Sequence, residues 1–364
     1  MTLTPFAEYL LSQRPNLTDE IVHPRFQLAT KEAMRYASLA SGGTILLITG
    51  ASGSGKSTLL RVMTRFFTEK VFKDVDDTQL PLIGMTAGTS NDGKVRMKYV
   101  LNALLSDLGH PSFDQRKIEI AGGYRPITRT DESSQLSMVR HGLNVNKTRI
   151  LLIDEAQFLT ENRNPDLRGG ILESMKSLVT SSTDLVLCGG FSLLVELDSL
   201  KAHLASRVIT IVVDRYRETD SDLVAWRKIV AAISKSPKIR LRDPDVLIRN
   251  SEQLLVETLG VIGVLERRVL QMAMSGPLVT QNSITATRPS KKKIAIMQAD
   301  IHLGESHLAD VYISTRPKGA DSAAPADGER PKRGGQEREV KKPRKTRHPP
   351  FHRNATRSVP KVNA

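Results

Sequence analysis

The sequence predicts an α/β fold with a parallel sheet of five strands, and three features lead to this expectation. Short apolar and β-branched runs recur along the first 215 residues, as in strands that are buried on both faces. Helical patterns lie between these runs, as in successive strand–helix–strand units. The run at residues 44–49 leads directly into a glycine-rich loop and then a helical pattern. This last feature also predicts a ligand.

The glycine-rich loop at residues 50–57 reads Gly-Ala-Ser-Gly-Ser-Gly-Lys-Ser, which is the spacing of a phosphate-binding P-loop. Its glycines allow the backbone to lie against a ligand, and its amide groups and the helix N-terminus direct partial positive charge at phosphates. Lys56 adds a full charge, and the Ser57 hydroxyl is placed to ligate Mg²⁺. We therefore predict a nucleoside triphosphate site. The loop residues assigned to it are Gly50, Ala51, Ser52, Gly53, Ser54, Gly55, Lys56, Ser57 and Thr58.

A second apolar run, at residues 149–155, ends in two carboxylates and reads Arg-Ile-Leu-Leu-Ile-Asp-Glu, a Walker B pattern. Because ligands bind at the carboxyl ends of parallel strands, Asp154 and Glu155 are expected beside the P-loop. Asp154 can hold Mg²⁺ through water, and Glu155 can polarise the water that attacks the γ-phosphate. A pair of carboxylates that only caps a helix is the alternative. Together the two motifs predict hydrolysis, with Lys56 and Glu155 as catalytic residues and ATP and Mg²⁺ as cofactors.

Three further strands are expected at residues 80–85, 184–188 and 208–213. The single cysteine, Cys188, lies in one of them, so we expect a buried thiol and not a nucleophile. One cysteine also excludes a disulfide framework and a zinc set.

Four regions are predicted along the chain. Residues 1–40 form a polar helical extension, and residues 41–215 form the nucleotide-binding α/β domain. Residues 216–275 are helical throughout and are expected to form a small lid. Residues 276–364 are expected to be a basic, largely disordered tail, with room for one short element around Ile294–Ile301.

The formal net charge of +14 is concentrated in the tail, where residues 314–364 hold 14 Lys and Arg against 5 Asp and Glu. Such a segment commonly binds nucleic acid or an acidic partner, and the alternative is a tail that only adds solubility. No apolar run approaches the roughly 20 residues of a membrane span, and the first residues lack the pattern of a signal peptide. We therefore expect a cytoplasmic protein with no membrane partner.

Over residues 15–275 the chain resembles the AAA+ family, and within it the TniB/TnsC-type ATPases that regulate DNA transposition. The ATPase motifs above carry the family resemblance. The narrower one rests on Val-His-Pro-Arg-Phe at 22–26, Leu-Gly-His-Pro at 108–111 and Asp-Glu-Ala-Gln-Phe-Leu at 154–159. For the class with an additional strand, it implies the strand order 5-1-4-3-2. Relatives commonly place a threonine that senses the γ-phosphate where this chain has Gly190, which leaves Ser192 as the candidate sensor.

The resemblance also implies arginines that act on ATP. Arg207, directly before the last strand, is the candidate arginine finger, which would reach across a subunit boundary to the transferring phosphoryl group. An arginine that only caps the preceding helix is the alternative. Gly263, followed by Glu266, Arg267 and Arg268, resembles a sensor-2 region, and the pattern does not decide which arginine faces ATP.

Members of this family assemble as ATP-dependent rings or helical filaments around double-stranded DNA and recruit a transposase to the target. The stretch that matches their DNA-lining segment is residues 89–98, where a flexible turn leads to three cations at alternate positions. Phosphate contacts made in this way would be sequence-nonspecific, and an ordinary solvated helix start is the alternative. The candidate DNA-binding residues are Lys94, Arg96 and Lys98, with Arg116 and Lys117 as a second set.

Two classes of function therefore compete. The first is an ATP-dependent DNA-transposition regulator that oligomerises on double-stranded DNA, recruits a transposase, works with target-selection proteins and disassembles on hydrolysis. The second is an AAA+ ATPase that acts on a protein partner, of the secretion-associated or helicase-loader type. Such relatives usually carry a membrane segment, a peptidoglycan-binding domain or a winged helix, and the sequence shows no sign of these. Glu155 argues against a switch that only binds ATP, because such a switch needs no water-polarising carboxylate.

Overall fold

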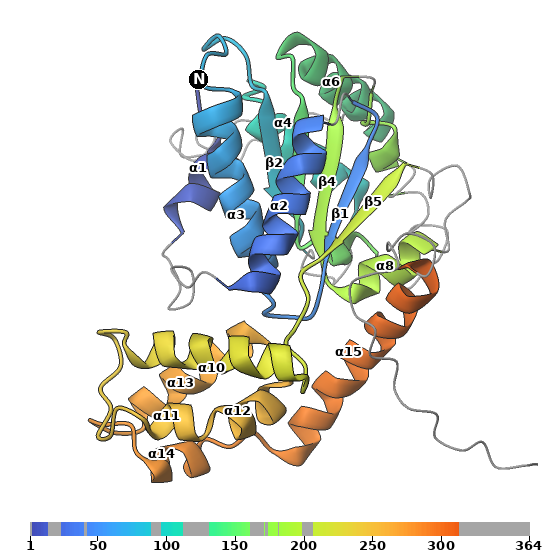
Figure 1. The fold of residues 1–364 in the computed structure, drawn as a ribbon. Helices are drawn as coiled ribbons and strands as arrows, with labels where there is room; N and C mark the ends of the chain where they lie inside the picture. The colour runs from blue at the N-terminus through green and yellow to red at the C-terminus, as the bar shows by residue number, and fades with distance from the viewer. Residues whose placement is uncertain are drawn as a thin grey trace, which may run out of the picture. The chain divides into compact units, whose positions relative to one another are not determined.

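The computed structural model describes residues 2–13, 23–39, 42–88, 96–111, 131–160, 171, 174–180, 182–198 and 207–312. Within this part of the chain, a central sheet holds five parallel strands in the order β2-β3-β4-β1-β5 (Figure 1). This is the predicted order 5-1-4-3-2 counted from the other edge, so the predicted α/β fold class is confirmed. The strands are β1 (Ile45–Thr49), β2 (Leu82–Thr86), β3 (Ile150–Asp154), β4 (Asp184–Gly189) and β5 (Val208–Val212).

The register of the strands aligns their carboxyl ends at one edge of the sheet. Thr49 at the end of β1 pairs with Gly189 of β4 and with Val212 of β5. Thr86 at the end of β2 pairs with Asp154 at the end of β3. The loop after β1 and the carboxylates after β3 therefore meet at the same edge.

Both faces of the sheet are covered by helices because successive strand residues point to opposite sides. Leu46 and Ile48 pack into the core formed with the N-terminal helices, and Ile45 and Leu47 pack into the core on the other face. The first face is covered by α1 (Pro5–Ser12), α2 (Pro24–Leu39) and α3 (Lys56–Phe66), which η1 (Phe67–Val71) extends. The second is covered by α4 (Met97–Asp107), α6 (Glu132–Val145) and α8 (Phe191–Asp198), while η2 (Ala156–Leu159) follows β3.

The predicted lid is a helical bundle with its own core around Trp226 and Tyr216, both almost completely buried. The Trp226 indole N–H donates to the Ser251 carbonyl at 2.9 Å, which satisfies the polar end of this buried ring. The bundle contains α10 (Asp220–Ser234), α11 (Val246–Arg249), α12 (Ser251–Thr258) and α13 (Ile262–Met274).

The structure corrects the predicted start of the tail. Residues expected to be largely disordered form α14 (Gln281–Ala286) and α15 (Lys291–Tyr312). A capping box between Thr280 and Ser283 starts α14, and Ile284 is buried in the lid core. Ile301 of α15 is buried against Phe191 of α8, which gives this polar helix a packing partner that its weak pattern did not reveal.

Residues 313–364, which carry the basic tail, lie outside the described residues. Among the helices that the structure describes, none combines the length and the apolar character needed to cross a lipid bilayer.

Candidate nucleotide-binding and hydrolysis site

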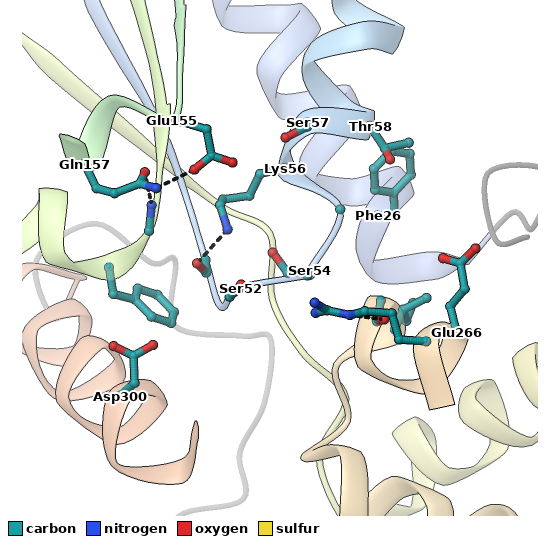
Figure 2. A pocket seen from close by; sticks show the side chains of 18 of the residues that line it. Phe26, Ser52, Ser54, Lys56, Ser57, Thr58, Glu155, Gln157, Glu266 and Asp300 are labelled. Atoms are coloured by element: carbon teal, nitrogen blue, oxygen red, sulfur yellow. Dashed lines mark hydrogen bonds between the residues drawn. The ribbon is translucent and has the colours of Figure 1, made fainter. Parts of the chain in front are cut away.

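A pocket of about 490 Å³ lies at the carboxyl edge of the sheet, a volume in the range of about 300–1,000 Å³ typical of ligand sites. Figure 2 shows Glu155 and Gln157 on one side of the P-loop and Phe26 and Glu266 on the other. The loop residues Gly50, Ser52, Gly53, Ser54, Gly55, Lys56, Ser57 and Thr58 all line the pocket. The predicted loop residues, with the exception of Ala51, therefore lie around one pocket.

The P-loop needs glycine at positions where other residues would be strained. Gly53 and Gly55 have φ angles of 86° and 104°, in the left-handed region. A Cβ on Gly53 would lie 3.0 Å from Nη2 of Arg267, so the missing side chain also makes room for the lid. The Ser54 hydroxyl is buried and, within the described part of the chain, has no hydrogen-bond partner. The loop thus offers a cradle in which backbone amides can approach a phosphate.

Lys56 begins α3 and turns its ammonium back over the loop. Its Nζ donates to the carbonyls of Gly50 at 3.1 Å and Ala51 at 2.9 Å. Burial lowers the pKa of Lys56, while the carboxylates of Glu155, Asp154 and Asp300 act in the opposite direction. The ammonium therefore lies among three carboxylates, at the place where phosphate oxygens would compete for it.

Asp154 ends β3 and is buried beside the loop. Its Oδ1 accepts the backbone N–H of Glu155 at 2.9 Å, and Ser57 and Cys188 also hydrogen-bond to its carboxyl group. Burial raises the pKa of Asp154, which is the expected cost of holding a carboxylate in this place. A hydroxyl and a carboxylate in contact are hard oxygen ligands, so Ser57 and Asp154 fit the predicted Mg²⁺. When bound, the ion would neutralise charge on the phosphates.

Glu155 lies one residue further on, in the left-handed region with φ 52° and ψ 35°. Gln157 of η2 bridges it to the turn after β4. The Gln157 Nε2 donates to Oε2 of Glu155, and its Oε1 accepts the Gly190 N–H at 3.0 Å (Figure 2). The sequence pattern assigned no chemistry to Gln157, because its partner Gly190 is 33 residues away.

The side of the pocket opposite Glu155 contains His23 and Phe26, from the N-terminal extension. Nδ1 of His23 lies 3.0 Å from the Tyr216 hydroxyl, and burial lowers the pKa of His23 to about 4. His23 is therefore neutral at physiological pH. The two rings, with centroids 5.4 Å apart, give this part of the pocket an aromatic surface, which the sequence pattern at 22–26 did not predict.

The lid touches the P-loop directly through the start of α13. The Gly263 N–H donates to the Gly53 carbonyl at 2.9 Å, and a Cβ on Gly263 would lie 2.5 Å from that oxygen. Arg267 lines the pocket with Glu266. Arg268 instead is buried in the lid, where it pairs with Glu257 and donates to the Ile284 carbonyl at 3.1 Å. Of the two arginines, Arg267 is the one placed to meet a nucleotide.

The helix α15 contributes a carboxylate to the pocket, Asp300, from far along the chain. Next to it, Gly304 packs so closely on Phe191 that a Cβ there would overlap the ring. The next residue, Glu305, binds Arg215 at 2.7 Å and Arg217 at 3.3 Å, at the junction between β5 and the lid. The same junction holds Asp214, which pairs with Arg217 at 3.0 Å.

Among the described residues, Arg207, Arg96 and Lys98 do not line the pocket. Arg207 directly precedes β5, and its carbonyl accepts the N–H of Ile45, the first residue of β1. It is therefore at the amino edge of the sheet, roughly 16 Å from the carboxyl edge at about 3.3 Å per strand residue. Arg96 and Lys98 flank the first residue of α4. Lys94, Arg116 and Lys117 lie outside the described residues. Ser192, the candidate sensor, lines the pocket.

Residues 39–194 match the family model described as an AAA domain. No curated protein sequence matches the chain. Among solved structures, the chain is similar to the Walker-type ATPase paby2304 of Pyrococcus abyssi, at 14% identity over 83% of this chain and 79% of that chain, with a TM-score of 0.46. It is also similar to the ORC2 protein of Aeropyrum pernix, at 13% identity over 83% of this chain and 85% of that chain, with a TM-score of 0.45.

A third similar structure is Cdc6p of Pyrobaculum aerophilum, at 12% identity over 77% of this chain and 70% of that chain, with a TM-score of 0.48. These three likenesses are distant. The match to an AAA domain covers the segment that holds the P-loop and the Walker B carboxylates, and it supports ATP hydrolysis in this pocket.

Proposed function

We propose that the chain is an ATP-dependent regulator of DNA transposition, which assembles on double-stranded DNA, recruits a transposase to the target and disassembles on ATP hydrolysis. The observation that carries the proposal furthest is the position of Arg207. It lies at the edge of the sheet opposite the pocket, so it cannot reach ATP bound in its own chain. This position is compatible with a role in the pocket of a second copy.

This position supports a homo-oligomer in which each ATP lies between two subunits. Within one chain, Lys56, Ser57, Asp154 and Glu155 surround the place expected for the phosphates. A guanidinium from a neighbour would stabilise the charge that spreads over the transferring phosphoryl group. Hydrolysis would then weaken the contact between subunits, because it removes the group that the guanidinium binds.

The path of the chain after β2 supports a link between DNA and this site. β2 lies beside β3, and the Ala87 N–H donates to the Asp154 carbonyl at 2.8 Å. Arg96 and Lys98 follow at the start of α4. Phosphates bound by these cations would lie on the segment that follows β2, the strand beside the Walker B strand. Binding would be sequence-nonspecific and would weaken with salt.

The test is duplex-DNA binding with negative-stain imaging, in ATP, a slowly hydrolysed ATP analogue, ADP or no nucleotide, at two salt concentrations. We expect oligomers on DNA only with ATP or its analogue, and fewer of them at the higher salt. Replacement of Lys94, Arg96 and Lys98 by Glu should remove DNA binding while ATP affinity is kept. The matched control is Lys235 and Lys238 to Glu, which changes two exposed cations of the lid.

Binding of ATP without any response to DNA would overturn the proposal. It would favour the second class of function, an AAA+ ATPase that acts on a protein partner of the secretion-associated or helicase-loader type. If DNA binding occurs, addition of a transposase from the same DNA element tests the recruitment step directly.

A further inference from the structure

We propose that Gln157 is a positioning residue for ATP hydrolysis, which holds the Glu155 carboxylate in the orientation that activates the attacking water. The inference rests on the role proposed for Glu155 as the water-polarising carboxylate. Gln157 lines the pocket and makes two side-chain hydrogen bonds there, one to Glu155 and one to Gly190. Both bonds are drawn in Figure 2.

The direction of the Gln157 amide is fixed by its second partner. A backbone N–H can only donate, so the group that meets the Gly190 N–H at 3.0 Å must be the Gln157 oxygen. The amide nitrogen then points at Oε2 of Glu155, to which it donates. A flip of the amide would break both bonds at once, so the glutamine is held in a single orientation.

The end of β4 is shaped to accept this side chain. A Cβ on Gly189 would lie 2.7 Å from Oε1 of Gln157 and 3.0 Å from its backbone nitrogen. A larger residue at position 189 would therefore displace the glutamine. The same turn leads to Ser192, which lines the pocket, so Gln157 fixes Glu155 relative to the turn that carries this hydroxyl.

The bond suits a carboxylate that must accept a proton. A glutamate has three rotatable side-chain bonds, and an anchor on Oε2 restricts them while Oε1 stays available for water. An amide does not transfer its proton to a carboxylate, so the anchor leaves Glu155 able to act as a base. The backbone of Glu155 is in the left-handed region, which is energetically unfavourable for a residue other than glycine. Such a conformation persists only where the surrounding structure stabilises it.

In the reaction, the water oxygen forms a bond to the γ-phosphorus, and the bond from this phosphorus to the bridging oxygen breaks. The bridging oxygen leaves with the electron pair as part of ADP, and the water proton passes to Oε1 of Glu155. The Gln157 N–H stays on Oε2 throughout. Gln157 therefore contributes by orientation alone.

The closing experiment compares Gln157→Ala and Gln157→Glu with the parent and with Glu155→Gln, in single-turnover ATPase assays of the full chain under assembly conditions. We expect Gln157→Ala to lower the rate roughly 10- to 100-fold, with the affinity for a slowly hydrolysed ATP analogue changed less than about twofold. In a Glu155→Gln background the same change should cost nothing further, because Gln157 acts through Glu155.

Gln157→Glu guards against a variant that fails to fold, because its carboxylate can still accept the Gly190 N–H. It places two carboxylates in contact, and such a pair shares a proton. The acidic limb of the pH–rate profile should therefore move to higher pH. The matched control is Gln135→Ala, which removes a buried glutamine that donates to Asn102 at 2.9 Å in the core. It should leave the shape of the pH–rate profile unchanged.

The outcomes separate the two claims. If Glu155→Gln turns over like the parent, the role proposed for Glu155 is wrong. If Glu155→Gln is inactive but Gln157→Ala matches the parent, the role proposed for Gln157 is wrong. An equal loss from Gln157→Ala in both backgrounds, or an unchanged pH–rate profile for Gln157→Glu, would also overturn the inference.

Discussion

The two sides of the nucleotide pocket are built in different ways. The phosphate side consists of the loop after β1 and the carboxylates after β3, each within a few residues of a buried strand. The rest of the lining includes His23, Arg267 and Asp300, which come from three separate parts of the chain: the extension, the lid and α15. Local sequence determines the first side, and long-range packing determines the second. Mutations should therefore affect the chemistry on the first side and the capture and release of nucleotide on the second.

The largest effect is expected at a group outside both sides, Arg207. Arg207→Ala should lower ATP turnover at least about 100-fold if the guanidinium completes the neighbour's site. A Lys56→Ala subunit should not turn over ATP but still supplies Arg207. Mixing the two inactive variants should therefore restore part of the activity, as measured by phosphate release.

The control for Arg207 is Arg227→Ala, which removes a half-exposed arginine that pairs with Glu252 on the lid. Exposed pairs of this kind contribute little, so turnover should be unchanged. Parental turnover by Arg207→Ala would show that the pocket is complete within one chain. An inactive mixture would show that the arginine does not act across subunits.

The second test disrupts the packing of α15, the helix that contributes Asp300 to the pocket. Glu305→Arg replaces a carboxylate held by Arg215 and Arg217 with a like charge, so α15 should separate from α8 and the junction. We expect faster hydrogen exchange across α15 and nucleotide release several-fold faster, because a helix that covers the pocket is loosened. Fluorescent-ADP release and hydrogen exchange check both effects.

Two further variants sharpen this test. Gly304→Val should act in the same direction, since a Cβ at this position would overlap the Phe191 ring. Adding Arg215→Glu to Glu305→Arg should restore slow exchange in part, because the charges are exchanged and the pair can form again. If the amides of α15 exchange equally fast in all of these proteins, the packing of α15 does not control nucleotide release. The proposed difference between the two sides of the pocket would then be wrong.

Much of the phosphate side could be predicted because each of its motifs is local. The spacing from Gly50 to Ser57 and the pair Asp154 and Glu155 each follow a strand, so both can be read without knowledge of the fold. Arg267 could be chosen over Arg268 only in three dimensions, where Arg268 is buried against Glu257. Gln157 depends on a backbone N–H after β4, and no sequence pattern reveals such a bond.

The same reasoning explains why α15 was expected to be tail. It begins with three lysines and has a weak apolar face, and in isolation it reads as a polar, unpacked segment. Its ordering depends on Phe191 and on the arginines at positions 215 and 217, which the sequence does not place beside it.

A smaller effect is expected from Asp300, whose carboxylate lies in the pocket with Lys56. Asp300→Asn should tighten ATP binding about two- to fivefold, because it removes a negative charge near the phosphates that is partly screened by solvent. Binding of a slowly hydrolysed analogue at low and high salt checks this, and the gain should shrink as salt rises. Tighter binding that does not depend on salt would mean that packing and not charge is responsible.

The smallest net effect concerns the pH dependence of the free energy of unfolding. Two buried groups, His23 and Asp107, change this free energy in opposite directions as the pH rises. Burial lowers the pKa of His23 to about 4 in the folded chain, whereas in the unfolded chain this pKa is near 6.5. Between these two pH values, His23 is therefore protonated only in the unfolded chain. Its contribution to stability is therefore lost as pH falls through this window. Asp107, whose oxygens accept the N–H groups of Phe6 at 2.7 Å and Gly84 at 2.8 Å, has its pKa raised by burial to about 6. Its contribution is lost as pH rises from about 4 to 6.

When either group is removed, the free energy of unfolding should change with pH in the direction set by the group that remains. His23→Gln should give a protein that loses stability as pH rises from 4 to 6, and Asp107→Asn one that loses stability as pH falls from 6.5 to 4. Each slope should amount to about 2–3 kcal/mol across its window, and the parent should change less than either variant. Urea unfolding at several pH values measures this, with Tyr216→Phe as a control, because that change removes the hydroxyl that faces His23 without removing the imidazole. If the free energy of unfolding changes with pH in the same way in both variants, His23 is not buried beside Tyr216 as described. The aromatic surface assigned to the pocket would then also be wrong.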